Sequence, residues 1–66
     1  MRDYTNSEMR NLIDEHIHSE RDRNILKLCY IDGYTYESIA EKVELSPRRI
    51  STIISNGTVI IEKYLQ

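Results

Sequence analysis

Few side chains of this chain could do chemistry, and their spacing supports neither catalysis nor metal binding. The one cysteine, Cys29, rules out an intramolecular disulfide and a multi-cysteine metal site. It lies among apolar residues at helical spacing, so we interpret it as a small hydrophobic residue. His16 and His18 are two positions apart and point to different sides of a helix, which does not suit two ligands of one metal. Since no nucleophile is paired with a base, we expect no enzyme activity, no cofactor and no metal site.

The most informative segment is residues 34–50, where a short capped helix, a tight turn and a second capped helix follow one another. Thr35 is a good N-cap for the first of these helices, and Ser46 followed by Pro47 is a strong start signal for the second. Ala40 provides the small side chain that is needed where two helices cross closely. The apolar residues that can fix the crossing angle are Ile39, Val43, Leu45, Ile50 and Ile53. This pattern is typical of a helix-turn-helix.

Residues 20–50 resemble region 4 of bacterial sigma factors and its relatives among small phage regulators and response-regulator output domains. The resemblance covers about half of the chain. It rests on the helix that precedes the helix-turn-helix, on the Asp-Gly corner at residues 32–33 and on the Ser-Pro-Arg cap at residues 46–48. The glycine often found in the turn is replaced by Glu44. The resemblance implies a bacterial or phage module that binds duplex DNA, with the second helix in the major groove and the first across the phosphate backbone.

The same resemblance implies which residues contact DNA. Arg48 and Arg49 occupy the first turn of the recognition helix, where side chains reach base edges and phosphates. Short hydroxyl side chains follow on the open face of that helix, and the preceding helix offers its N-terminus and one lysine to the phosphates. The further expected contacts are Ser51, Thr52, Ser55, Thr35, Tyr36 and Lys42.

Charge sets the expected strength of this binding. The chain carries nine Lys and Arg against eleven Asp and Glu, which gives a net charge of −2. The recognition helix has no cation after Arg49, where the family usually continues with several. Because neutralised phosphates supply nearly all non-specific affinity, we expect a monomer to bind weakly and in a salt-sensitive way. These features also favour an alternative, a protein-interaction module such as a phage factor that binds RNA polymerase, a host regulator or a nuclease.

An all-α fold of four to five short helices must position these residues. The one proline and the two glycines fall between apolar-periodic segments. Asn6 or Ser7 is expected to cap the first helix, Asn56-Gly57 reads as the stop of the fourth, and Thr58 as the cap of a last one. The expected helices span residues 7–18, 20–32, 36–43, 47–56 and 59–65, in a single domain of residues 1–66. An extended strand is the alternative for the last segment, which is rich in β-branched residues.

Composition favours a cytoplasmic protein that associates with itself. No apolar run approaches the roughly 20 residues needed to span a bilayer, and an unpaired cysteine fits a reducing compartment. The apolar residues near the C-terminus exceed what one face of two short helices can bury, so we expect a homodimer through this segment. Packing of the same residues against the first helix is the alternative. The residues concerned are Ile53, Ile54, Val59, Ile60, Ile61 and Leu65.

Overall fold

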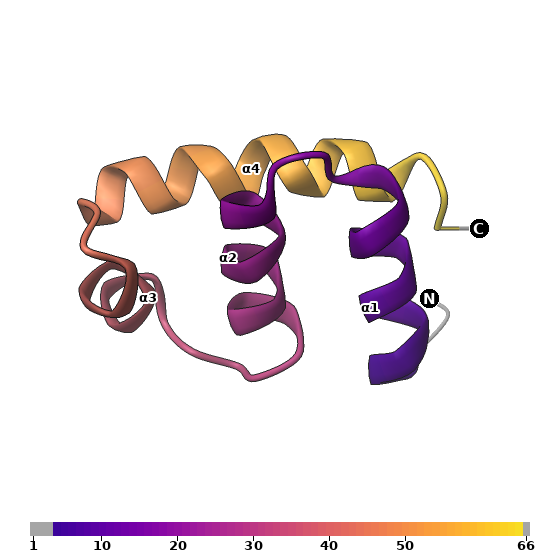
Figure 1. Ribbon diagram of the computed structural model, residues 1–66, viewed down its shortest axis with the longest axis horizontal. Coiled ribbons are helices and arrows are strands. Elements are labelled where there is room, and N and C mark those ends of the chain that lie inside the picture. The colour runs from indigo at the N-terminus through magenta and orange to yellow at the C-terminus, as the bar shows by residue number, and fades with distance from the viewer. Residues whose placement is uncertain (1–3, 66) are drawn as a thin grey trace.

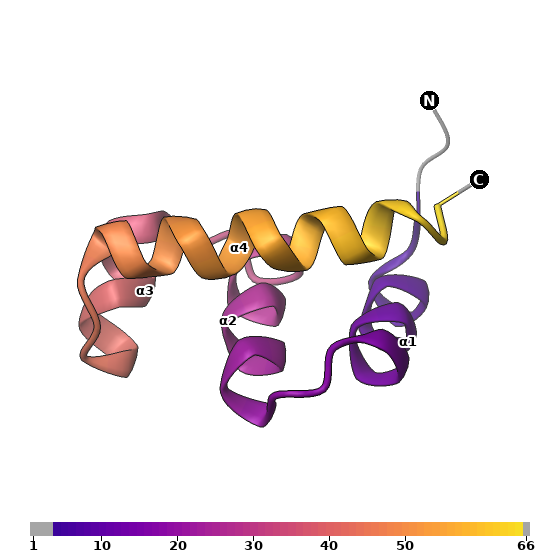
Figure 2. The same cartoon turned by 90° about the horizontal axis from the view of Figure 1, so that it is seen from above.

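The computed structural model describes residues 4–65, which form helices joined by short connections. The helices are α1 (Asn6–His16), α2 (Glu20–Tyr30), α3 (Tyr36–Val43) and α4 (Pro47–Glu62). Helix α4 is the longest and extends along the other three, with α3 near its N-terminal end and α1 near its C-terminal end (Figure 1 and Figure 2). The all-α class expected from the sequence is confirmed. None of these helices combines the length and the apolar composition that crossing a membrane requires.

Three helices begin where the sequence predicts. At the start of α2, the hydroxyl of Ser19 accepts the N–H of Asp22 at 3.4 Å. Thr35 and Ser46 cap α3 and α4 in the same way, each accepting the backbone N–H three residues further on at 3.1 Å. Pro47 is the first residue of α4, where its missing N–H leaves no hydrogen bond unmade. Each cap depends only on near neighbours in the sequence, which is why it could be predicted.

The predicted cap of α1 is wrong by one or two residues. Thr5, and not Asn6 or Ser7, is the N-cap. Its hydroxyl accepts the N–H of Glu8 at 3.1 Å, while the Glu8 carboxylate accepts the N–H of Thr5 at 2.9 Å. This reciprocal capping box satisfies two backbone donors at once, and only Thr5 has a glutamate three residues further on.

Helices α1 and α2 end at His16 and Tyr30, two residues before their predicted ends at residues 18 and 32. Ile17 takes an extended conformation directly after α1 while its side chain stays buried. Beyond α2, Gly33 has a φ of 76°, in the left-handed region that glycine adopts without steric cost. This glycine therefore lies in the turn after α2 and directs the chain toward α3.

Helix α4 passes through the predicted stop at Asn56-Gly57 without interruption, so the separate helix predicted for residues 59–65 does not exist. Gly57 is buried against α2, where a Cβ atom would lie 2.5 Å from Cδ1 of Leu26. The glycine is thus required by close packing of two helices and does not act as a terminator. Thr58, the predicted cap, lies inside α4, and its hydroxyl is hydrogen-bonded to the hydroxyl of Tyr30 on α2.

The core is almost entirely isoleucine, and every helix contributes to it. Its buried residues are Ile13, Ile17, Ile25, Leu26, Ile39, Ala40, Ile50, Ile53, Ile54 and Ile61. Three residues of the apolar C-terminal segment therefore fill the core of a single chain. In the same segment Val59 is 59% exposed. The apolar surplus behind the predicted homodimer is smaller than the sequence indicates, because the long α4 packs against α1 as well as α2 and α3.

An ion pair attaches α1 to α2, and a ring stack attaches it to the residues that follow α4. Nζ of Lys27 on α2 lies 2.7 Å from Oδ1 of Asp14 on α1. At the C-terminal end of the chain, the rings of His16 and Tyr64 stack with centroids 3.5 Å apart and planes 3° from parallel. His16 therefore contributes to packing between α1 and the segment that follows α4.

Candidate nucleic-acid interface

Helices α3 and α4 form the helix-turn-helix that the sequence predicts. Ile39 and Ile50 are fully buried on the two sides of the turn, and Ala40 is 4% exposed. The turn itself is made by Glu44, which has φ 60° and ψ 42° and occupies the left-handed position where a glycine is usual. The N–H of Leu45 then donates to the carbonyl of Ala40 at 3.0 Å, which closes the turn. The buried residues fix how α4 is presented relative to α3.

The N-terminal half of α4 borders a hollow on the surface of the molecule. We call it the arginine hollow, and its lining residues are Arg21, Asp22, Ser46, Arg48, Arg49, Thr52, Ile53 and Asn56. Among these described residues, the charged ones are three arginines and one aspartate, so the hollow has a formal charge of +2. The whole chain has a net charge of −2. The positive charge needed to bind an anionic partner is therefore concentrated at this end of α4.

Three of the expected contact residues meet in the arginine hollow. Arg48 and Arg49 are both exposed in the first turn of α4. Thr52, one turn further along, is also exposed, and its hydroxyl donates to the carbonyl of Arg48 at 3.2 Å. Ser55 is exposed and Ser51 half-buried, but neither lines the hollow. The two serines occupy an adjacent strip of α4.

The expected contacts on α3 form a second group, away from the arginine hollow. The hydroxyl of Thr35 is used in capping, since it accepts the N–H of Ser38 and donates to the hydroxyl of the same residue at 3.1 Å. Tyr36 is 39% exposed at the start of α3. Nζ of Lys42 lies 4.6 Å from the ring centroid of Tyr34, close enough for a cation–π interaction. Lys42 is thereby held beside the loop that precedes α3.

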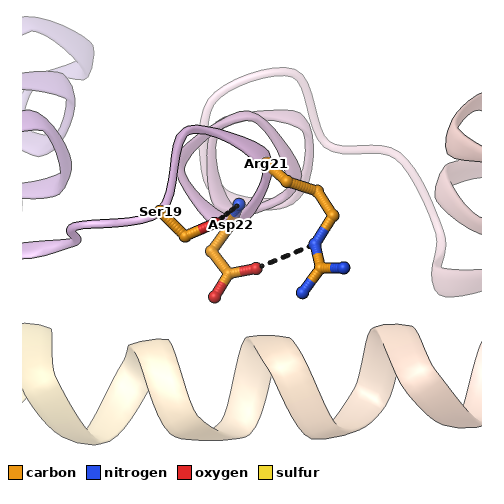
Figure 3. A network of polar contacts seen from close by, with 3 residues as sticks. All are labelled: Ser19, Arg21 and Asp22. Carbon is orange, nitrogen blue, oxygen red and sulfur yellow. Dashed lines mark hydrogen bonds and ion pairs between the residues drawn. The ribbon is translucent and has the colours of Figure 1, made fainter.

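Sequence reasoning missed the contribution of α2 to this site. Arg21 and Asp22 come from the first turn of α2, and Figure 3 shows both side chains directed toward α4. Nε of Arg21 lies 3.3 Å from Oδ1 of Asp22. Asn56 was also missed, because it was interpreted as part of a helix stop. The neighbouring charges were visible in the sequence, but nothing local indicated that the start of α2 would lie beside α4.

Residues that could act chemically lie outside the hollow or are unsuited to catalysis. Burial raises the pKa of the Cys29 thiol, so the reactive thiolate is disfavoured at neutral pH. Among residues 4–65, no group of three or more His, Cys, Asp or Glu side chains is placed to hold a metal ion. What the geometry offers is a positively charged surface at the start of an exposed helix, which suits phosphate binding.

Comparison with known proteins identifies one family. The family described as sigma-70, region 4, matches residues 19–59. No match was found among curated proteins or solved structures. The matched residues contain α2, α3 and most of α4, and they include every residue that lines the arginine hollow. Helix α1 lies before the matched segment.

Proposed function

The chain belongs to the sigma-70 region 4 family of DNA-binding helix-turn-helix domains, and we propose that it is a sequence-specific transcription regulator. In this proposal, the N-terminal turns of α4 enter the major groove of duplex DNA, and α3 lies across the phosphate backbone. The observation that carries the proposal is the position of Arg48 and Arg49, exposed beside a hollow of net positive charge. The protein acts in the cytoplasm, through binding and without catalysis.

The two arginines have the main role in this proposal. A guanidinium can donate two hydrogen bonds to O6 and N7 of guanine, and each such pair contributes about 1–3 kcal/mol of discrimination. Arg48 and Arg49 begin the helix, so one can reach a base edge while the other contacts phosphate. The proposed supporting contacts are the hydroxyl groups of Ser51, Thr52 and Ser55 on α4, and Thr35, Tyr36 and Lys42 on α3.

The arginine hollow also limits the strength of the proposed binding. Each phosphate that a protein neutralises changes the slope of log K against log salt by about −0.9. Three arginines, one of them paired with Asp22, correspond to two or three phosphates. We therefore expect a salt slope of about −1.8 to −2.7, and weak binding by one chain at physiological salt.

The test is replacement of Arg48 and Arg49 by alanine, followed by binding to duplexes enriched from a random pool with the wild-type protein. We expect affinity to fall at least about tenfold, because removing each bidentate interaction with a base costs about 1–3 kcal/mol. The salt slope should become shallower by about 0.9 for each phosphate that the variant no longer neutralises. Circular dichroism should show an unchanged helical signal, since both side chains are exposed.

The matched control removes the same charge elsewhere, by replacing Arg10 and Lys63 with alanine. Both residues are exposed, Arg10 on α1 and Lys63 just after α4, and neither lines the arginine hollow. The control should keep most of the wild-type affinity. Equal reductions of affinity in the two double variants would refute base or phosphate contact by Arg48 and Arg49.

A protein-interaction module is the second candidate function. It is favoured by exposed carboxylates on and just after α3, which bears Glu37 and Glu41 and is followed by Glu44. RNA polymerase, a host regulator or a nuclease would then be the partner. No binding of the wild-type chain to any duplex at low salt would support this function and exclude the DNA-binding proposal.

Self-association would strengthen weak DNA binding by doubling the contacts. The homodimer through the C-terminal segment stays a prediction. Val59 and Tyr64 are the large exposed residues available there, 59% and 47% exposed. Light scattering at several protein concentrations tests it, and a monomeric mass throughout would contradict it.

A further inference from the structure

One carboxylate lies among the arginines of the proposed DNA-binding face. Asp22 lines the arginine hollow together with Arg48 and Arg49, and its side chain is 31% exposed. Its neighbour Arg21 also lines the hollow, although residues adjacent in a helix do not normally face each other. The two side chains nevertheless extend on the same side of α2, and Nε of Arg21 lies 3.3 Å from Oδ1 of Asp22 (Figure 3).

The hydrogen bond that caps α2 does not depend on the charge of Asp22. The cap of α2 uses the backbone N–H of Asp22, which donates to the Ser19 hydroxyl whatever side chain the residue carries. Glu20 already supplies an acidic group in the first turn of α2, where negative charge interacts favourably with the helix dipole. An asparagine at position 22 would therefore keep the helix start while removing the charge.

We propose that Asp22 is a positioning residue that holds Arg21 away from phosphate and so weakens binding to DNA of random sequence. The proposal rests on the proposed DNA-binding function. Non-specific binding depends on neutralised phosphates. The Asp22 carboxylate repels a phosphate directly. It also pairs with Arg21, the third arginine of the hollow, which could otherwise bind that phosphate. With Asp22 in place, stable binding depends more strongly on the base contacts of α4.

The test compares Asp22→Asn with the wild-type chain on a random-sequence duplex, by fluorescence anisotropy across a salt titration. Release of Arg21 should tighten binding about threefold to tenfold at low salt and steepen the salt slope by about 0.9, equivalent to one more phosphate. Asp22→Glu keeps the carboxylate and should retain wild-type affinity. Glu62→Gln removes the same charge at the exposed C-terminal end of α4, about 20 Å along the helix from Arg48 and Arg49. It should change affinity by less than about twofold at about 0.1 M salt, where the Debye length is about 10 Å.

The same comparison in a chain that carries Arg21→Ala identifies the residue on which Asp22 acts. There the gain from Asp22→Asn should become smaller, because only the direct repulsion between the carboxylate and phosphate is left to remove. An equal gain with and without Arg21, or equal effects of Asp22→Asn and Glu62→Gln, would overturn the proposal. If the wild-type chain binds DNA and Asp22→Asn binds with the same affinity, only the role of Asp22 is refuted. If neither the wild-type chain nor any variant binds DNA, the proposed DNA-binding function is refuted as well.

Discussion

Gly57 offers a sharp test of how the helices pack, because alanine there has two opposing effects on the free energy of unfolding. Within a helix, alanine is favoured over glycine by about 1 kcal/mol. The added Cβ, however, would lie 2.5 Å from Cδ1 and 2.9 Å from Cδ2 of Leu26. Leu26 is fully buried, so its side chain cannot move without disturbing the core. Overpacking of this kind costs about 1–3 kcal/mol, and we expect Gly57→Ala to be destabilising by about 1 kcal/mol overall.

Thermal denaturation followed by circular dichroism measures this effect. For a domain of this size, a decrease of about 1 kcal/mol in the free energy of unfolding lowers Tm by about 4–8 °C. Ser55→Ala is the matched control, since Ser55 is exposed on the same helix and should show only the small gain in helix propensity. A second variant, Leu26→Val, shortens the opposing side chain, so Gly57→Ala should cost less in that background. The reasoning is refuted if Gly57→Ala raises Tm as the control does. It is also refuted if Gly57→Ala lowers Tm equally in the wild-type and the Leu26→Val backgrounds.

Two further predictions concern the turn and the partly buried thiol of Cys29. Glu44→Gly should stabilise the protein by about 0.5 kcal/mol, because the left-handed conformation strains a residue with a Cβ more than it costs glycine in entropy; a lower Tm would contradict this. Since burial raises the Cys29 pKa, iodoacetamide should alkylate the folded protein more slowly than the urea-unfolded chain at about pH 8. The alkylation rate of the folded protein should keep rising at a pH where the rate of the unfolded chain has levelled off. Equal alkylation rates in the two states would show that the thiol is not protected.

Much of the helix-turn-helix could be predicted because its signals are local. A serine or threonine that caps a helix acts on an N–H only three residues away, so Thr35 and Ser46 were correctly assigned. The error at α1 was also a local one. Thr5 competes there with Asn6 and Ser7, and the glutamate at position 8 was the available signal for the capping box.

The candidate site was only half visible in the sequence. Arg48 and Arg49 could be placed because the start of their helix was known. Arg21 and Asp22 could not, since they precede these arginines by 26 to 28 positions and only packing of α2 against α4 brings the four together. The expected contacts also divide into two groups, because α4 and not α3 lies beside the start of α2 where the arginine hollow forms.

The sequence by itself determined that the chain is helical, where three of the helices begin and which residues start α4. These properties depend on apolar periodicity and on hydrogen bonds between near neighbours. Only the tertiary structure decided that Gly57 continues α4, because its role is to make room for Leu26 of another helix. The same packing buries Ile53, Ile54 and Ile61 within one chain and places Asp22 among the arginines. A dipeptide such as Asn-Gly carries the same local preference in a turn or inside a helix, and the contact across the core selects between them.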